Sequence, residues 1–377
     1  MRNVDLRVGA LDGLRGVAII LTFCVHYFGT YLLLTLGKSP DAMSFRDMTT
    51  LSSQVAYVLF RSHYGVYLFF VISGFLIGRI VVTSKSRSYW QFLKRRLLRI
   101  YPPFLFSFAA IVLFRITYQG GYDAISRPTF AGVLGNLLFL NGLPALGVQI
   151  ILPNNVTWSL FFEMAFYLVL PVSWLIGRGK SGLIIVSMIG LGLCYLAPLW
   201  TSMYLFTPLF FGAILACVEP ATCRAMMERL PQSVLLSTAV LVASLWCFDV
   251  VSRNAMLWLI SIPGTMLVAE AVYSNRLLSK ALTTAPLLGL GRISYSFYLM
   301  HSVAMFGFMQ ASRLDLRLLT FPQVLLFGCA CFFAATVVSY VAFQISERFY
   351  FAKVARPVSL PAGPIPAAAD NERAAVT

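Results

Sequence analysis

Arg15 and His26 are the first residues in the chain whose types and spacing suggest chemistry. They lie eleven positions apart in the sequence. In an α-helix this separation is about 20° from three full turns, so both side chains share one helix face, roughly 16 Å apart along the axis. His26 lies inside a long apolar run, where a neutral imidazole can act as a general base on a hydroxyl group. A buried histidine that hydrogen-bonds a neighbouring helix is the alternative interpretation.

Glu163 is a second candidate, because it follows Trp158-Ser159-Leu160-Phe161-Phe162 within an apolar stretch. A carboxylate at such a depth is costly and is usually paired. It could orient a histidine, hold an arginine or bind substrate, or it could belong to a structural ion pair. Glu270 also lies in an apolar stretch but has no comparable context, and we interpret it as structural.

His301 lies in a third apolar stretch, which begins near Ser294. Tyr298 and Ser294 precede it by three and seven residues, so the three side chains share one helix face. This polar stripe could face a cavity or form ordinary bonds between helices. His63 precedes the second apolar run, and we expect it at the outer membrane interface.

A basic run, Lys94-Arg95-Arg96-Leu97-Leu98-Arg99, precedes Pro102 and Pro103, which we expect to set the start of the next span. If the run is helical, Arg95, Arg96 and Arg99 form one basic patch, and guanidinium groups bind phosphate well. A phosphate-bearing donor that binds this patch from the cytoplasmic side is one possible ligand. Basic topology signals and lipid headgroups are the other interpretation.

Membrane-spanning helices must position these side chains. Of the 377 residues, 59% are hydrophobic and 11% are charged, and the mean hydropathy is +0.80. This composition excludes an ordinary soluble domain, which has about 25% charged residues. We predict an all-α, polytopic integral membrane protein with about ten transmembrane helices. The predicted spans are residues 16–37, 62–78, 100–118, 156–176, 181–218 as two spans, 232–248, 254–275, 286–311 and 322–346.

Two further segments complete the predicted organisation. A short re-entrant or interfacial piece is expected at residues 130–142, because Pro144, Pro153 and Asn154-Asn155 interrupt a long uncharged stretch. Residues 1–351 are expected to form the transmembrane domain, and the Pro/Ala-rich residues 352–377 a disordered cytoplasmic tail.

The net charge of +15 is explained by topology. Most basic residues fall in cytoplasmic segments if both termini are inside, so we predict a multi-pass protein with cytoplasmic termini and membrane lipids as neighbours. Nucleic acid is not an expected partner. The seven scattered cysteines indicate neither a zinc site nor a disulfide framework, and no metal is expected.

The motifs, taken in order, resemble a known family. They are Leu11-Asp12-Gly13-Leu14-Arg15-Gly16 with His26, Phe69-Phe70-Val71-Ile72-Ser73-Gly74-Phe75-Leu76-Ile77, Arg95-Arg96-Leu97-Leu98-Arg99-Ile100-Tyr101-Pro102, Trp158-Ser159-Leu160 with Glu163 and Phe166-Tyr167-Leu168, and Ile293-Ser294-Tyr295-Ser296-Phe297-Tyr298-Leu299 with His301. On this layout the chain resembles the membrane-bound acyltransferase family three, integral-membrane O-acyltransferases best known from bacteria. The resemblance covers residues 9–350.

The resemblance implies transfer of an acyl group, usually acetyl, from acyl-CoA to a hydroxyl of a glycan, glycolipid or glycosylated metabolite. It implies the bacterial inner membrane, and acyl-CoA as a co-substrate with no permanently bound cofactor. His26 would be the base that takes the hydroxyl proton, Arg15 would contact the donor phosphates or order the donor channel, and Glu163 would shape the cavity, orient the acceptor or stabilise charge. The implied substrate-binding residues are Arg95, Arg96, Arg99, Asp12, Ser73, Trp158, Tyr298 and His301.

Several positions depart from the family pattern. Tyr67 stands where an acidic or polar residue is frequent, Met164 where a second acid is common, and Phe349 where proline is usual. These departures do not change the family that the chain resembles, but they leave the acceptor molecule unidentified. No esterase domain of the SGNH type is present in the sequence, so we expect a stand-alone transferase or one that hands the acyl group to a partner.

A transporter or exporter of a glycan or acyl compound is the alternative, supported by the polytopic layout and the histidines at mid-depth. Acyl-CoA-dependent ester formation would exclude it. The sequence shows no two-halves symmetry of the kind that many transporters have.

Overall fold

The fold was obtained as a computed structural model, which describes residues 2–39, 42–83, 88–117, 130–140, 156–176, 179–197 and 202–349. Helices make up the described part, and none of its residues forms a β-strand. The prediction of an all-α fold is therefore confirmed. The predicted tail at residues 352–377 and the predicted break at Pro144–Asn155 lie outside the described residues.

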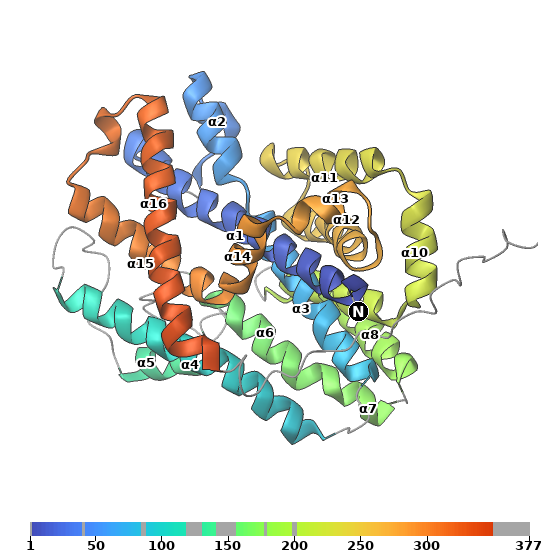
Figure 1. The fold of residues 1–377 in the computed structure, drawn as a ribbon. Helices are drawn as coiled ribbons and strands as arrows, with labels where there is room; N and C mark the ends of the chain where they lie inside the picture. Colours follow the sequence, from blue (N-terminus) through green and yellow to red (C-terminus); the bar gives the residue numbers. More distant parts are fainter. Residues whose placement is uncertain are drawn as a thin grey trace, which may run out of the picture.

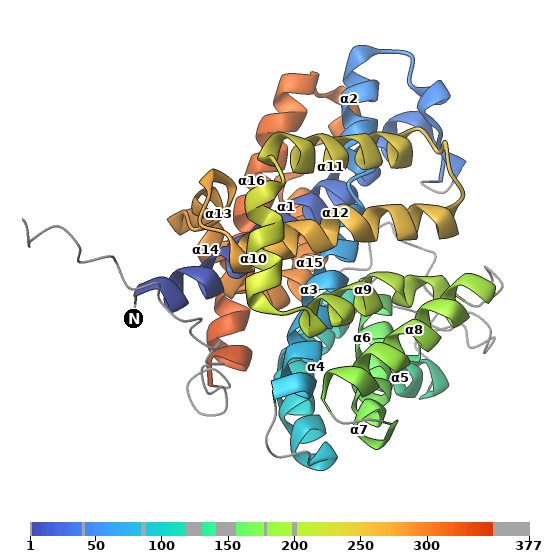
Figure 2. The same cartoon turned by 90° about the vertical axis from the view of Figure 1, so that its right-hand side faces the viewer.

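The longest helix, α1 (Arg2–Leu36), runs through the middle of the bundle in both views (Figures 1 and 2). It carries Arg15 and His26 and contacts helices from both halves of the chain. The other main helices are α2 (Leu51–Phe60), α3 (Tyr64–Thr83), α4 (Tyr89–Thr117), α5 (Phe130–Leu137), α6 (Trp158–Val169), α7 (Ser173–Ile176), α8 (Lys180–Leu196), α9 (Thr207–Cys217), α10 (Pro220–Arg229), α11 (Gln232–Cys247), α12 (Arg253–Tyr273), α13 (Leu277–Leu282), α14 (Ala285–Arg292), α15 (Ser294–Ser312) and α16 (Phe321–Ala342), which continues as a π-helical turn, Phe343–Glu347.

Most predicted spans coincide with an apolar helix, but fewer helices are long enough to cross a membrane alone. Within the described ranges, six helices meet that condition by length and composition. Met203–Cys217 and Pro220–Arg229 form a pair bent by 107°, which could count as a seventh span. Helices α8 and α11 are apolar but shorter. The count of ten is thus approximate, and the multi-pass character is confirmed.

Two boundaries differ from the prediction. Helix α4 begins at Tyr89, and Pro102 and Pro103 lie inside it rather than at its start. A proline removes a backbone donor, but neighbouring helices can compensate within a bundle, so the basic run and the apolar run become one helix. The predicted span 286–311 is divided between α14 and α15, with Ile293 at the junction.

Glycines let the backbones around α1 and α3 approach closely. A Cβ at Gly291 of α14 would lie 1.9 Å from the Asp12 carbonyl oxygen, and a Cβ at Gly74 of α3 would lie 1.9 Å from the Leu209 carbonyl oxygen of α9. Only glycine fits such contacts, as in other tightly packed membrane helices. Gly74 thus lets α3 and α9 approach closely, and Gly291 fixes α14 beside Asp12 and Arg15.

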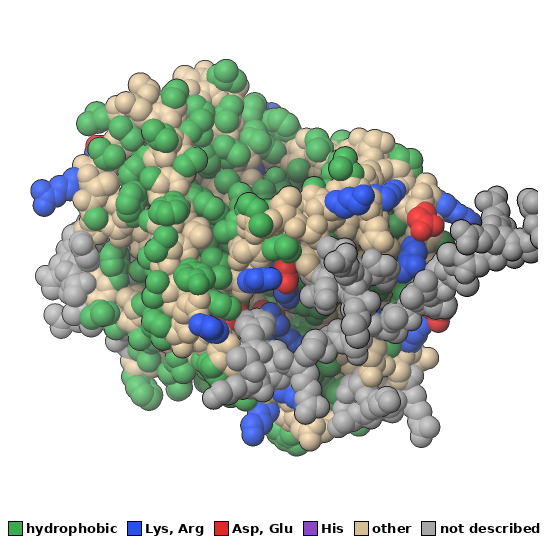
Figure 3. Space-filling model, in the orientation of Figure 1, with side chains coloured by type: hydrophobic (Ala, Val, Ile, Leu, Met, Phe, Trp, Pro, Cys, Tyr) green, Lys and Arg blue, Asp and Glu red, His purple; other side chains and the backbone are tan. Residues whose placement is uncertain are grey.

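The outer surface is apolar over α16, where many large side chains are exposed (Figure 3). They include Leu326, Phe333, Val337 and Val341. Because exposed apolar side chains in such a continuous stripe are suited to contact with lipid, this face is consistent with a membrane-embedded helix.

Candidate active site

His26 and His301 face each other across α1 and α15. Their ring centroids are 5.0 Å apart, and the planes are tilted by 53°. His301 is fully buried, whereas His26 is only partly buried. The structure thus brings together two histidines that are 275 positions apart in the sequence.

The backbone of α15 fixes the tautomer of His301. Its Nδ1 lies 3.0 Å from the Phe297 carbonyl oxygen and 2.9 Å from that of Tyr298. A carbonyl oxygen can only accept, so Nδ1 carries the proton and Nε2 of the neutral ring keeps its lone pair. The Phe297 ring stacks nearly parallel on the imidazole at 5.6 Å and holds its orientation. His301 can therefore accept a hydrogen bond through Nε2.

The polar stripe predicted on α15 serves two purposes. The Tyr298 hydroxyl lies 2.7 Å from Ser159 Oγ and donates to the Val156 carbonyl oxygen at 2.8 Å, which ties α15 to the start of α6. Ser294 instead lines a cavity. One end of the stripe is therefore interhelical bonding and the other faces open space, so both interpretations of the sequence apply.

Glu163 is bound by hydroxyl groups. Ser73 Oγ of α3 donates to Glu163 Oε1 at 3.1 Å, and the Tyr167 hydroxyl, one turn further along α6, donates to the same oxygen. No ion pair of Glu163 is present among the residues that the structure describes. Arg15 nevertheless lies within electrostatic range of this carboxylate. Glu163 is therefore a partly buried acid near the arginine, oriented by Ser73 and Tyr167.

Arg15 lines a cavity of about 320 Å³ toward the N-terminal end of α1. Arg15 Nη1 pairs with Asp12 Oδ1 at 2.8 Å, one turn earlier on the same helix. Glu347, 1% exposed in the π-helical turn, accepts a hydrogen bond from Ser296 Oγ at 2.7 Å. The full lining is Asp12, Arg15, Arg99, Gly291, Arg292, Ser294, Phe343 and Glu347. Three arginines and two acids give this cavity a net positive charge.

The arginines of the basic run have three different surroundings. Arg99 lines the cavity, Arg95 is exposed, and Arg96 is buried with its guanidinium over the rings of Phe92 and Tyr167 at 5.7 and 5.6 Å. They do not form the single patch that we predicted, because a helix turns by about 100° per residue and α4 is embedded on one side. Trp158 packs edge-on against Phe70 and Phe162, so in this structure it contributes to the apolar core.

Sequence reasoning missed Glu347 and Arg292 as cavity residues. An acid at the end of the last apolar run was a usable signal, since buried carboxylates in membrane proteins are rare and usually paired.

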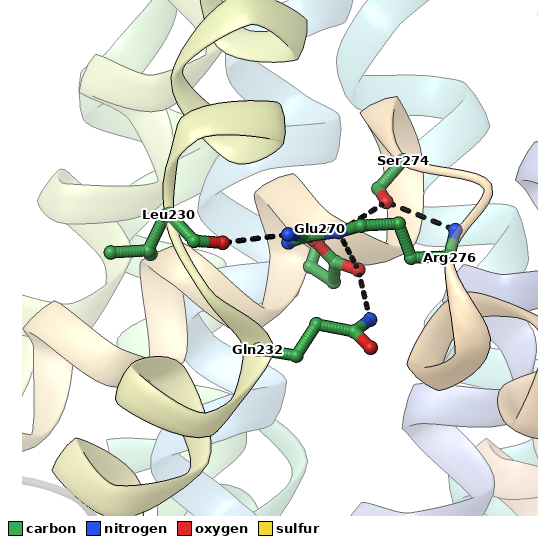
Figure 4. Close-up of polar contacts among 5 residues, drawn as sticks. All are labelled: Leu230, Gln232, Glu270, Ser274 and Arg276. Atoms are coloured by element: carbon green, nitrogen blue, oxygen red, sulfur yellow. Dashed lines mark hydrogen bonds and ion pairs between the residues drawn. The ribbon is translucent and has the colours of Figure 1, made fainter.

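A different buried acid, Glu270, forms a structural ion pair (Figure 4). Its side chain is fully buried, and Arg276 contacts both of its carboxylate oxygens. Gln232 Nε2 donates to Glu270 Oε1 at 2.8 Å, and Arg276 Nη1 donates to the Leu230 carbonyl oxygen at 2.6 Å. The network ties α12 to the α10–α11 connection, so the structural interpretation of Glu270 is confirmed.

Comparison with known proteins assigns the chain to a family. A family model described as an acyltransferase domain matches residues 8–343, and the chain belongs to this family of membrane-embedded acyltransferases. This is the family that the motifs of the sequence resemble. Family membership favours acyl transfer over the transporter alternative.

Two groups of curated relatives match part of the chain. The O-acetyltransferase OatA of Staphylococcus aureus (strain NCTC 8325 / PS 47) is 29% identical over 278 residues, which are 63% of this chain and 45% of the relative. The peptidoglycan O-acetyltransferase OatA of Listeria monocytogenes serovar 1/2a (strain ATCC BAA-679 / EGD-e) is 26% identical over 284 residues, 63% of this chain and 44% of that relative. The matched part spans less than half the length of these relatives. No solved structure matches the chain.

Proposed function

We propose that this protein transfers an acyl group, most simply acetyl, from acyl-CoA to a hydroxyl group of a glycan or glycoconjugate in the plasma membrane. The observation that carries the proposal is the pairing of His26 with His301, whose tautomer leaves Nε2 as an acceptor. The relatives are named as O-acetyltransferases, and one of them as a peptidoglycan O-acetyltransferase, which supports an acetyl group and a polysaccharide acceptor.

His26 is the proposed base. If one ring N–H of His26 points to His301 Nε2, the other ring nitrogen keeps a lone pair for the acceptor hydroxyl. His26 takes the hydroxyl proton as the hydroxyl oxygen forms a bond to the thioester carbonyl carbon. The carbon–sulfur bond then breaks, and the His26 imidazolium returns its proton to the departing thiolate. The products are an ester and free CoA, and the base is regenerated.

The cavity beside Arg15 is the proposed site for the phosphorylated part of the donor. Arg15 and Arg99 both line it, and guanidinium forks bind phosphate oxygens through paired hydrogen bonds. Asp12 orients Arg15 through their ion pair. Because Arg15 and His26 share one face of α1, roughly 16 Å apart along its axis, a donor anchored at Arg15 can extend its thiol arm toward His26. Glu163 and Ser73 would orient the reactants between these points.

Purified full-length protein in detergent micelles tests the proposal directly. We expect acetyl-CoA to lose its acetyl group with release of free thiol, and a glycan from a panel that includes muramyl disaccharides to gain one acetyl group by mass spectrometry. His26→Ala should lower this rate by about 10²–10⁴-fold while leaving the melting temperature unchanged. Wild-type protein that forms no ester with any glycan would contradict the function. A fully active His26→Ala variant would contradict the role of the base alone.

A further inference from the structure

Arg79 of α3 carries a buried guanidinium whose Nε has no hydrogen-bond partner among the residues that the structure describes. The residue is only 6% exposed, and its Nε makes no hydrogen bond. Within the described ranges, no carboxylate forms an ion pair with it. A buried charge that lacks both a counter-ion and hydrogen bonds is strongly unfavourable, so native structures rarely keep one unless a ligand completes the site.

Tyr273 of α12 is a second unsatisfied donor at the same place. It is 4% exposed, and its hydroxyl has no hydrogen-bond partner. Phe75, one turn before Arg79 on the same face of α3, meets the Tyr273 ring edge-on at 6.3 Å. Arg79 also lies within electrostatic range of Tyr273 and of Cys223 in the first turn of α10. Two unsatisfied donors, one from α3 and one from α12, therefore lie in the same region of the described structure.

The helices next to Arg79 compensate its positive charge only weakly. The C-terminal ends of α9 and α12 lie near Arg79 and carry partial negative charge, but within the described ranges none of their carbonyl oxygens accepts a hydrogen bond from Arg79 Nε. Glu270, the acid of α12, is already paired with Arg276. No anion of the described part of the chain therefore pairs with Arg79.

Its position suits a lipid headgroup. Arg79 lies four residues before Thr83, where α3 ends, or roughly 6 Å along the helix axis from that end. The surrounding apolar cluster includes Leu11 and Leu14 from the N-terminal part of α1, so Arg79 lies toward the same end of the bundle as the Arg15 cavity. Arg79 does not line that cavity. Basic pockets between helices at this depth bind phospholipid headgroups.

We propose that Arg79 and Tyr273 bind the phosphate group of an anionic phospholipid between α3, α10 and α12. The phosphate oxygens would accept hydrogen bonds from the guanidinium and from the tyrosine hydroxyl. The bound lipid neutralises the buried charge and links helices from the two halves of the chain. This site is separate from the acyl-transfer site and does not depend on the proposed function.

The test compares thermal stability in delipidated detergent micelles with and without added dioleoylphosphatidylglycerol. We expect the lipid to raise the melting temperature of the wild type by about 3 °C or more, because a ligand that binds only the folded state stabilises it. Arg79→Gln should lose this rise and, without lipid, should melt no lower than the wild type, since an unpaired buried charge has been removed. Arg229→Gln, which removes an exposed charge from α10, should keep the full rise.

Two further arms identify the contacts and the source of the phosphate. Tyr273→Phe should weaken lipid binding about 3–10-fold by loss of one hydrogen bond, measured from the lipid concentration at half of the maximal rise. Inorganic phosphate and adenosine 3′,5′-bisphosphate should not raise the melting temperature through Arg79. The proposal is overturned if Arg79→Gln melts lower than the wild type without lipid or responds fully to lipid, if Arg229→Gln loses the rise equally, or if the soluble phosphates act through Arg79 and the lipid does not.

Discussion

In the proposed reaction, single residues at the site divide the task between a reactive ring, His26, and a supporting ring, His301. His26 is partly exposed and can meet a substrate, whereas His301 is fully buried and bound to its own helix. The second ring can therefore act only through the first. This division resembles other general bases, in which a fixed acceptor holds the imidazole so that its lone pair faces the proton it removes.

Replacement of His301 tests whether this residue orients His26 for catalysis or only packs in the bundle. His301→Asn should lower kcat by about 10–100-fold with little change in the KM for acyl-CoA, because an orienting contact is lost while donor binding is kept. His301→Gln places an amide nearer to the position of Nε2 and should recover part of the rate. Steady-state kinetics on both variants measure this. Equal activities of the two variants, or a loss confined to KM, would contradict the positioning role.

Glu163 can be tested for its charge rather than its hydrogen bonds. Glu163→Gln keeps an oxygen that accepts from Ser73 and Tyr167 but removes the negative charge near Arg15. We expect a fall in kcat of about 10-fold or more, with the melting temperature nearly unchanged. Ser73→Ala, which removes one hydrogen bond and keeps the charge, should lose less activity. A larger loss in Ser73→Ala than in Glu163→Gln would show that the hydrogen bond, not the charge, matters.

The sequence predicts which residues share a helix face but not which residues meet between helices. Arg15 and His26 could be placed on one face because a single helix carries both. The meeting of His26 with His301 could not be predicted from spacing, because it depends on how α15 packs against α1. The contact of Glu163 with Ser73 was likewise hidden, since Ser73 lies on a different helix, whereas Tyr167 lies one turn along the same helix and its contact follows from helical spacing.

At the scale of the helices, close backbone contacts position the site, and these contacts leave little room for larger side chains. Apolar runs predicted which segments are helical, because the period and length of a hydrophobic stretch report directly on burial in a membrane. They did not predict the start of α4 or the break at Ile293, because both depend on tertiary contacts that satisfy the backbone.

Two glycines on α14 provide a matched test of the packing. A Cβ at Gly291 would lie 1.9 Å from the Asp12 carbonyl oxygen, whereas a Cβ at Gly289 would meet nothing within 4 Å. Gly291→Ala should destabilise the protein by about 1–3 kcal/mol or more and lower activity, since α14 must shift away from Asp12 and Arg15. Gly289→Ala should be neutral or slightly stabilising. Melting temperature and yield in detergent measure both, and similar behaviour of the two variants would contradict the packing described.

The Glu270–Arg276 pair should stabilise the fold without serving catalysis. Glu270→Ala leaves the Arg276 guanidinium near a buried site without its carboxylate, which we expect to cost about 3–5 kcal/mol. Arg317→Gln, which breaks a pair with Asp315 whose side chains are 61% and 33% exposed, should change the melting temperature little. Activity per folded molecule should be unchanged in both variants. A catalytic defect in folded Glu270→Ala would instead connect this network to the reaction.

At the scale of the whole molecule, the Arg15 cavity and the histidine pair lie at different positions along one bundle. The cavity is near the N-terminal end of α1, where the basic residues Arg15, Arg99 and Arg292 gather. His26 lies further along α1 and meets His301 of α15 there. If the basic end faces the cytoplasm, a soluble donor can reach the cavity while the acceptor approaches from the other side. The orientation of the bundle therefore decides whether this arrangement suits transfer across the membrane.

Cysteine labelling in intact cells tests the orientation. Leu318, 82% exposed after α15, should face outward, and Arg229 at the end of α10 should face the cytoplasm. In a protein with exposed Cys329 replaced by serine, Leu318→Cys should react with a membrane-impermeant maleimide in intact cells. Arg229→Cys should react only after permeabilisation. The reverse pattern would place the arginine cavity outside, where no acyl-CoA is available, and the proposed donor side would be wrong even if the acyl-transfer chemistry were retained.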